Sequence, residues 1–521
     1  MSLISLLKCS PLALGFALAL AQPSVAQTAL PKTLSENAAD LAAGRTTSVA
    51  LVQAYLARIA AIDDAGPAIR AVIVTNPDVI AQAQALDAER AAGRVRGLLH
   101  GIPILLKDNI ESADAMATTA GSLALRNNVT RRDAPMVARL RAAGAIILGK
   151  TNLSEWANFR GNNSTGGYSL TGGLTRNPHL LTHNSCGSSS GSGAGMAARL
   201  ASGAIGTETD GSIVCPTSIN GVVGFKPTVG LVSRSRIVPI SRSQDTAGPM
   251  TLTVRDAAIM LTAMAGSDPA DPATVEADAR KVDYVAALSA NGLRGLRVGV
   301  VRTQGTNEGL ISAAITRLRA AGATVVSVTY PAAGTLGSAE NTVLLTEFKV
   351  DIGLYLQGLP VGLVPHKTLA DLIAFNNANA ATELQFFGQE TFIQAQATTG
   401  LNSTTYTSAL ATARRLSRTD GLDRLFANNR LDLLVTQTNG PAWRTTLGSG
   451  DAFIPPSSSQ RPAVAGYPHL SVPMGAQAGL PIGLSFIGLK WADAKVLSAG
   501  HAFEIAGPNL AVAPAFTPSR P

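Results

Sequence analysis

Residues 184–216 read NSCGSSSGSGAGMAARLASGAIGTETDGSIVCP and hold two serine clusters set among glycines. The first cluster spans 187–191 and the second 210–212; an alanine-rich segment, 193–200, and a short apolar run, 204–206, lie between them. Good helix formers predict a helix over the alanine-rich segment, with its N-terminal amides toward the first cluster. The apolar run predicts a strand. We therefore expect this stretch to form a loop, a helix, a strand and a second loop.

Serines flanked by glycine can belong to a flexible connection or to a reactive site. Glycine allows backbone conformations and close approaches that other residues do not. A serine placed among glycines can therefore act as a nucleophile beside bare N–H donors. Composition by itself is equally compatible with an ordinary Gly/Ser loop.

Strand patterns and helix patterns alternate on both sides of this stretch. Apolar runs predict strands at 69–75, 101–106, 145–148, 221–226, 297–301, 323–329, 431–436 and 483–488, and amphipathic segments predict helices at 48–62, 77–92, 134–143, 253–265, 311–321 and within 369–425. Such alternation predicts an α/β fold with a mixed central sheet covered by helices on both faces. The chain has 521 residues, 46% hydrophobic and 15% charged, which favours one compact body over disorder.

The N-terminus has the pattern of a secretory leader. Lys8 precedes an apolar core at 11–21, and small residues at 24–26 offer a cleavage site. We expect residues 1–26 to be a signal peptide and 27–521 to be one catalytic domain. No later stretch reaches the ~20 apolar residues of a membrane-spanning helix, so we expect an exported protein, periplasmic or secreted, that does not bind the membrane.

The charge bears on nucleic-acid binding, and the cysteines bear on a possible disulfide. The formal net charge is +8, but there is no run of basic residues and aromatic residues are few, so we expect no nucleic-acid partner. We also expect the protein to be a monomer. Without Cys9, which lies in the leader, Cys186 and Cys215 remain, one beside each serine cluster. An oxidising compartment permits a disulfide between them, and two buried thiols fit the sequence equally well.

Two literal motif matches suggest other functions. Residues 144–151, GAIILGKT, match the phosphate-binding loop with Lys150, but the loop of that motif should follow a strand, whereas 145–148 is itself the predicted strand. Residues 187–191 match the G-x-S-x-G elbow of serine esterases, with Ser189 as nucleophile. No apolar strand leads into this elbow.

An esterase would also need a histidine, and none stands in a distinctive setting. The histidines available downstream are His366, His469 and His501. A lysine is the alternative base. Lys107 follows the predicted strand 101–106, and a lysine at the end of a buried strand can be desolvated enough to stay neutral and accept a proton. From the sequence pattern alone, Lys150 and Lys226 remain rivals.

Several segments resemble the amidase signature family. They are HGIPILLKDNI around Lys107, ATTAGS at 117–122, GKTNLSEWANF at 149–159, CGSSSGS at 186–192, GTETDGSIVCP at 206–216, INGVVGFKPT at 219–228 and SQDTAGPM at 243–250. The variants SEWANFRG, CGSSSGS and TETDGSIVCP most resemble the bacterial peptide amidases, the branch of the family that removes the C-terminal amide of peptides. The resemblance covers most of the chain after the leader and implies the amidase signature fold.

The resemblance implies a Ser-Ser-Lys triad without metal or cofactor. Its members would be Lys107 as base, Ser188 as bridging serine after a cis Gly187–Ser188 bond, and Ser212 as nucleophile. Residues 209–212 (Thr209, Asp210, Gly211 and Ser212) would form the oxyanion hole with their backbone amides. Ser189 would support the proton relay through hydrogen bonds.

The resemblance also implies hydrolysis of a carboxamide to a carboxylic acid and ammonia through an acyl-enzyme. The expected substrate is the C-terminal amide of a peptide, and the alternative is an aliphatic or aryl amidase of broad specificity. The family's ammonia-producing subunit for tRNA transamidation fits less well, because of the leader. Two departures from the family pattern stand out. Asp210 places a carboxyl beside the oxyanion hole, at a position where glycine is common. Cys186 and Cys215 take positions usual for other residues, and we interpret them as packing residues.

Overall fold

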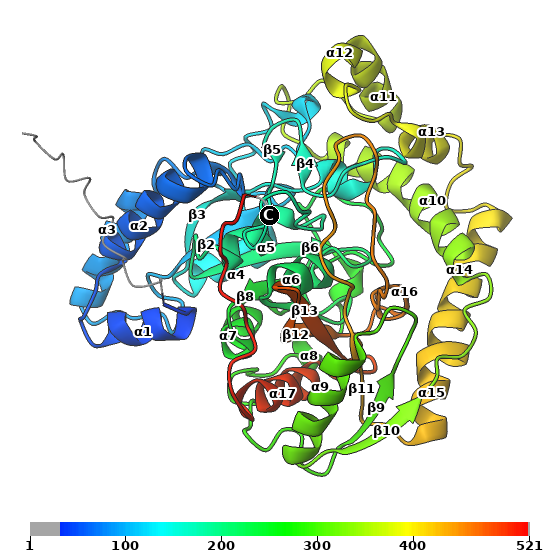
Figure 1. Ribbon diagram of the computed structural model, residues 1–521. Helices are drawn as coiled ribbons and strands as arrows, with labels where there is room; N and C mark the ends of the chain where they lie inside the picture. The colour runs from blue at the N-terminus through cyan, green and yellow to red at the C-terminus, as the bar shows by residue number, and fades with distance from the viewer. Residues whose placement is uncertain (1–31, 519–521) are drawn as a thin grey trace, which may run out of the picture. The chain divides into compact units, whose positions relative to one another are not determined.

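An eleven-stranded sheet runs through residues 32–518, the part of the chain that the computed structural model describes (Figure 1). The strand order is β1-β3-β2-β6-β8-β7-β12-β13-β11-β9-β10. The strands are β1 (Val72–Thr75), β2 (Pro103–Lys107), β3 (Ile146–Thr151), β6 (Gly203–Glu208), β7 (Val223–Lys226), β8 (Thr246–Thr251), β9 (Arg297–Val301), β10 (Thr324–Val328), β11 (Leu433–Gln437), β12 (His469–Gln477) and β13 (Leu480–Ile487). The small strands β4 (Tyr168–Ser169) and β5 (Gly173–Leu174) pair separately.

The sheet is mixed. Strands β3, β2 and β6 run parallel to one another, as do β11, β9 and β10, whereas the pairs between β6 and β11 are antiparallel. The chain from Lys32 onward forms one compact unit. The predicted leader lies outside the described residues.

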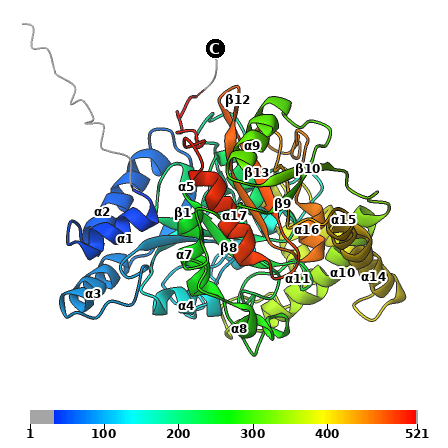
Figure 2. The ribbon, with the colours of Figure 1, turned by 90° about the horizontal axis from the view of Figure 1, so that it is seen from below.

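Helices cover both faces of the sheet, as predicted. One apolar cluster joins α2 (Ser48–Arg58), α3 (Val79–Ala91) and α5 (Ser190–Ala197) to β2, β3 and β6. A second cluster joins the opposite face to another set of helices, of which α7 (Val254–Met264) and α17 (Asp493–Ile505) lie near the centre of Figure 2. The others of this set are α1 (Leu34–Ala42), α4 (Pro135–Ala142) and α9 (Glu308–Ala320).

The remaining helices lie mostly along the edge of the molecule at the right of Figure 1. There α10 (Leu336–Gln357) packs against α14 (Thr404–Ser417) and α13 (Glu390–Gln396). The others are α6 (Val214–Asn220), α8 (Ala277–Arg280), α11 (Leu369–Ala378), α12 (Ala380–Glu383), α15 (Asp423–Asn429) and α16 (Gln460–Ala465). The predicted helical region 369–425 is confirmed.

Strand alternation turns Lys107 toward the serine-bearing face. Side chains along a strand point alternately to opposite faces. Ile104 and Leu106 of β2 belong to the cluster with α4 and α7, and Leu105 belongs to the cluster with α5. Lys107, two residues after Leu105, therefore points to the side on which α5 begins.

Several elements differ from the sequence prediction. Helix α5 begins at Ser190, inside the first serine cluster, and not at residue 193. Strand β8 was not predicted, because Gly248 and Pro249 argue against a strand interior. Helix α10 was missed, because polar side chains such as Glu340 and Glu347 are buried on it and interrupt the apolar periodicity.

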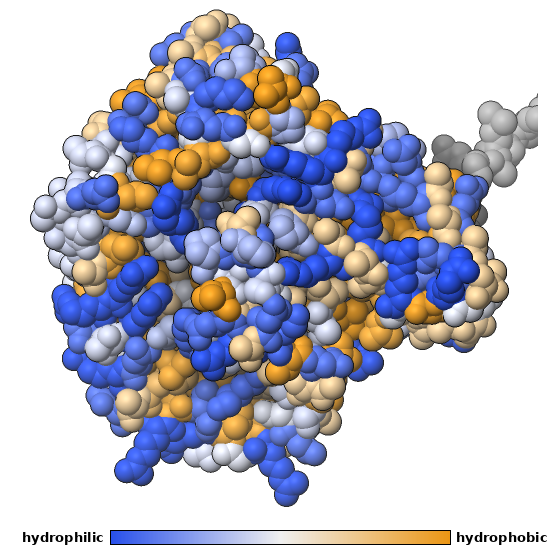
Figure 3. Space-filling view, turned by 180° about the vertical axis from the view of Figure 1, so that it is seen from behind, coloured by the Kyte–Doolittle hydropathy of each residue, from blue (hydrophilic) through white to orange (hydrophobic). Residues whose placement is uncertain are grey.

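No helix within residues 32–518 is long and apolar enough to cross a bilayer. On the face seen in Figure 3, hydrophobic residues lie singly or in small groups among hydrophilic ones. This mixture is usual for a protein whose large apolar side chains are mostly buried.

Candidate active site

Lys107 lies at the carboxyl end of β2 and is completely buried. Its Nζ lies 2.8 Å from Ser188 Oγ, 2.8 Å from Thr207 Oγ1 and 3.3 Å from Thr207 O. Ser188 lies two residues before the start of α5, and Thr207 lies on β6, the strand next to β2. The structure thus brings together a lysine and a serine that are far apart in sequence.

Burial lowers the pKa of Lys107 to about 7, although Asp245 and Glu208 act in the opposite direction. A large fraction of the lysine is therefore neutral at neutral pH. A neutral amine beside a hydroxyl can accept its proton. Lys107 has both the position and the protonation state of a general base toward Ser188.

The rival lysines have other partners. Lys150 Nζ donates to Ile110 O and to Thr118 Oγ1 (2.9 Å). Lys226 Nζ donates to Pro227 O at 3.4 Å. Among the described residues, no hydrogen bond joins either lysine to the two serine clusters. The phosphate-loop match at Lys150 is refuted, since β3 includes Gly149, Lys150 and Thr151 as a fully buried strand.

The Ser189 hydroxyl is engaged by the backbone of β6. It donates to Thr207 O at 3.0 Å and accepts from Thr207 N at 3.2 Å. The preceding Gly187–Ser188 bond is cis, as the family resemblance led us to expect. The described residues give Ser189 no histidine partner; His469, for example, bonds to Ser485. The G-x-S-x-G elbow is therefore not assembled here.

The second serine cluster forms a loop between β6 and α6 and exposes backbone donors. Gly211 adopts a φ of +84°, a conformation that favours glycine. Within residues 32–518, no hydrogen bond is donated by the backbone N–H groups of Asp210, Gly211 or Ser212. Consecutive free amides in such a turn make a concave site for an anion. The loop can therefore stabilise negative charge beside the Ser212 side chain.

Glu208 supports this loop from behind. Its Oε2 accepts hydrogen bonds from Ile213 N at 2.7 Å and Val214 N at 2.9 Å, at the start of α6. These are the amides that follow directly on the free ones. The carboxylate thus anchors the helix that begins after Ser212, and it leaves the preceding amides unoccupied.

Two links hold the serine clusters together. Ser189 N donates to Ser212 O at 3.2 Å, and Cys186 and Cys215 form a disulfide. Our interpretation of the two cysteines as packing residues was wrong: they join the loop before Ser188 to the helix after Ser212. The sequence pattern left the disulfide open because it does not reveal how near the two loops lie.

Thr207 and Asn109 were not predicted from the sequence. Thr207 Oγ1 accepts from Lys107 and also from Asn109 Nδ2, at 3.0 Å. No strand order could be predicted from the sequence, and their proximity follows from the parallel pairing of β2 and β6, with Leu106 opposite Ile205. Residues that follow the carboxyl ends of adjacent parallel strands meet at one edge of a sheet.

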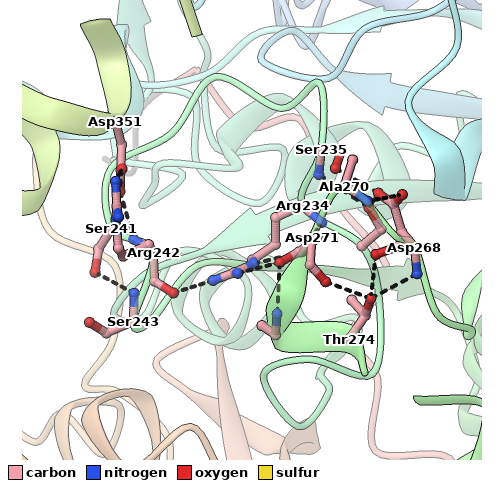
Figure 4. Close-up of polar contacts among 12 residues, drawn as sticks. Arg234, Ser235, Ser241, Arg242, Ser243, Asp268, Ala270, Asp271, Thr274 and Asp351 are labelled. Carbon is pink, nitrogen blue, oxygen red and sulfur yellow. Dashed lines mark hydrogen bonds and ion pairs between the residues drawn. The ribbon is translucent and has the colours of Figure 1, made fainter. Parts of the chain in front are cut away.

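A cavity of about 520 Å³ reaches these residues. Its inner wall includes Asn109, Thr207 and Thr209, and its outer wall includes residues 234–242 and part of α10. Figure 4 shows the outer wall braced by ion pairs: Arg234 Nη2 lies 2.5 Å from Asp271, and Arg242 pairs with Asp351 on α10. The cavity is therefore lined by Thr207, a hydrogen-bond partner of Lys107, and by the paired charges of Arg234 and Arg242.

Metal binding finds no support in the side-chain arrangement. Within the described part of the chain, no group of three or more His, Cys, Asp or Glu side chains is arranged to hold a metal ion. The chemistry that this site offers is that of serine hydroxyls, a neutral lysine and backbone amides.

Gly206→Ala is expected to destabilise the protein by about 1–3 kcal/mol, because the close approach of Ser189 to β6 leaves no room for a side chain. The added Cβ would lie 2.8 Å from Ser189 Oγ and 2.6 Å from Met250 Sδ. Thermal or denaturant unfolding measures the effect. Gly195→Ala in α5 is the control, since its Cβ would meet nothing nearer than 3.6 Å; an equal loss in both variants would contradict the steric explanation.

Comparison with known proteins adds to this geometry. The amidase family profile matches residues 50–497. The native peptide amidase from Stenotrophomonas maltophilia is 51% identical, with a TM-score of 0.89, and the match covers 94% of this chain and 99% of that one. A peptide amidase in complex with the competitive inhibitor chymostatin is 52% identical, with a TM-score of 0.90, over 94% and 99% of the two chains. A probable amidase of Arabidopsis thaliana is 42% identical over 88% of this chain and 87% of its own.

Proposed function

Because the chain belongs to the amidase family, we propose that it hydrolyses the C-terminal amide of peptides to the free acid and ammonia, through Lys107, Ser188 and Ser212. The observation that carries this proposal is the 2.8 Å contact between Lys107 Nζ and Ser188 Oγ. Ser212 is held against the residue that follows Ser188, and three free amides lie beside it. These contacts support a site in which Lys107 is the base, Ser188 the bridging hydroxyl and Ser212 the nucleophile, with the free amides as the anion site.

In the proposed reaction, neutral Lys107 takes the proton of Ser188 while Ser188 takes the proton of Ser212. The Ser212 oxygen then attacks the amide carbon. The amides of residues 209–212 stabilise the oxyanion of the tetrahedral intermediate, at ~3 kcal/mol for each well-placed donor. The C–N bond breaks as the relay returns a proton to the nitrogen, which leaves as ammonia. Water, deprotonated by the same relay, attacks the ester carbonyl, and Ser212 leaves with a proton.

The peptide substrate is favoured by the similarity to peptide amidase over nearly the whole chain. The cavity of about 520 Å³ is in the range of pockets that bury ligands larger than a simple aliphatic amide. The second candidate is an amidase of broad specificity, which the same catalytic groups would serve equally well.

Ammonia release from a matched set of amides tests this proposal. The set comprises amidated dipeptides and tripeptides, the same peptides as free acids, glutamine, and simple aliphatic and aryl amides. We expect the amidated peptides to have the highest kcat/KM and the free acids to release no ammonia. A higher kcat/KM for simple amides would favour the broad-specificity amidase. Absence of ammonia from every amide would overturn the proposal.

The pH dependence should follow Lys107. Its pKa is lowered to about 7, and the active form is the neutral amine, so kcat/KM should rise with pH and level off above about 7. Below that value the protonated lysine predominates and kcat/KM should fall about tenfold per pH unit. An N-acylated peptide amide keeps substrate ionisation out of the measurement. A profile that stays flat from pH 5 to 8 would contradict a lysine base.

A further inference from the structure

We propose that Asp210 is a positioning residue that carries a proton shared with Glu340, and so holds the oxyanion loop in place without adding a negative charge to it. This inference rests on the proposed function, in which the amides of residues 209–212 receive the oxyanion. It also accounts for a carboxyl at a position where a charge would oppose the reaction.

The surroundings of Glu340 identify it as the anionic partner. Glu340 is buried on α10, and its two oxygens accept hydrogen bonds from two glutamines. Gln244 Nε2 donates to Oε1 at 2.9 Å, and Gln460 Nε2 donates to Oε2 at 2.9 Å. A carboxyl that accepts at both oxygens is best matched as a carboxylate.

The orientation of Gln244 is fixed by a second partner. Its Nε2 also donates to Thr209 O at 3.2 Å. A backbone carbonyl can only accept, so the amide NH₂ of Gln244 must point at both Thr209 O and Glu340. Gln244 therefore connects Glu340 directly to the backbone of the oxyanion loop.

The carboxyl groups of Asp210 and Glu340 interact with each other as hydrogen-bonding groups, and Ser459 also acts on Asp210. Two carboxyl groups can share a hydrogen bond only if one is protonated. Because Glu340 already receives two amide hydrogens, the proton belongs to Asp210. Asp210 Oδ1 is buried without a partner, which is less costly for a neutral acid than for a carboxylate.

The neighbouring charges are consistent with this assignment. Burial and the charges of Glu340 on α10 and Glu208 at the end of β6 raise the pKa of Asp210 well above its usual value, and the hydrogen bond from Ser459 opposes them. The cation acting from β7 is Lys226. The balance favours the neutral form of Asp210. On ionisation at higher pH, it would repel both Glu340 and the oxyanion.

Asp210→Asn and Glu340→Gln form a discriminating pair. The asparagine NH₂ can replace the shared proton and donate to Glu340, so we expect Asp210→Asn to lose clearly less kcat at neutral pH than Glu340→Gln does. In Glu340→Gln, the new NH₂ must face the NH₂ of Gln244 or Gln460, and we expect kcat to fall roughly tenfold or more with KM little changed. The opposite order of the two variants would overturn the assignment.

The alkaline side of the pH profile gives a second readout. Above the plateau set by Lys107, ionisation of Asp210 should lower kcat of the unmodified enzyme as pH rises further, whereas kcat of Asp210→Asn should show no such alkaline decline. An identical alkaline decline in both proteins would overturn the proposal.

Infrared spectroscopy supplies a readout that needs no turnover. At neutral pH, the carbonyl band of a buried carboxylic acid should be present in the unmodified protein and lost in Asp210→Asn. Absence of this difference between the two proteins would overturn the proposal. The measurement does not depend on Glu340→Gln, so it remains decisive even if that variant fails to fold. Retained activity in Ser212→Ala would instead refute the proposed function, so the two failures can be told apart.

Discussion

Ser212→Ala is expected to lower kcat on an amidated peptide by roughly 10⁴- to 10⁶-fold, the usual consequence of removing a catalytic nucleophile. Ser212 is only 8% exposed, and within residues 32–518 its hydroxyl makes no hydrogen bond whose partner alanine would leave unpaired, so the fold should persist. Initial rates of ammonia release measure the loss, and thermal unfolding verifies the fold. Lys107→Met should cause a loss of similar size, because the proposed relay then has no proton acceptor.

Ser189→Ala is the matched control for this prediction. Ser189 is adjacent to Ser188, but its hydroxyl bonds to the backbone of Thr207 and not to Lys107. We expect a loss of kcat of no more than roughly 100-fold, by displacement of the relay. An active Ser212→Ala variant together with an inactive Ser189→Ala variant would refute our assignment and favour the G-x-S-x-G serine as nucleophile.

Removal of the disulfide should have the largest effect on stability. Cys186 and Cys215 are separated by 29 positions, and a ring of this size contributes about 3–4 kcal/mol in the chain-entropy account. We expect Cys186→Ser/Cys215→Ser to lower the free energy of unfolding by up to this amount. Activity should also decline, because the disulfide joins the segments that carry Ser188 and Ser212.

Reducing agent separates this effect from simple loss of packing. It should destabilise the unmodified protein and leave the double serine variant unchanged. Equal stability of the unmodified protein with and without reductant, after complete reduction has been verified by mass spectrometry, would contradict the prediction. A stabilising disulfide also fits the export expected from the leader sequence.

Local patterns predicted much of the fold. Strand β9 has the predicted bounds, and α2, α3, α4 and β3 lie within a few residues of theirs, because the strands are continuous apolar runs and the helices are amphipathic. The ends of helices were predicted less accurately. Helix α5 begins at Ser190 and not at residue 193, although serine is only a moderate helix former. Tertiary packing sets such boundaries.

The residues of the candidate site could be predicted where a reactive side chain stands in a recognisable local sequence. Lys107 could be singled out because a lysine ends an apolar strand, and the family resemblance indicated Ser188 and Ser212. Glu340 could not be found in this way. It lies on an unpredicted helix, and its relation to Asp210 depends on how distant segments pack. Buried polar pairs of this kind leave no periodic trace in a sequence.

The strand order also constrains when the protein can fold during synthesis. Strands β9, β10 and β11 connect to β7 only through the hairpin of β12 and β13, which spans His469–Ile487. A nascent chain that has not yet reached His469 would hold two unjoined parts of a sheet, with the edges of β7 and β11 unpaired. Unpaired edges invite association between chains. Completion of the sheet therefore waits for the last tenth of the polypeptide, and until then the edges of β7 and β11 remain open to association with other chains.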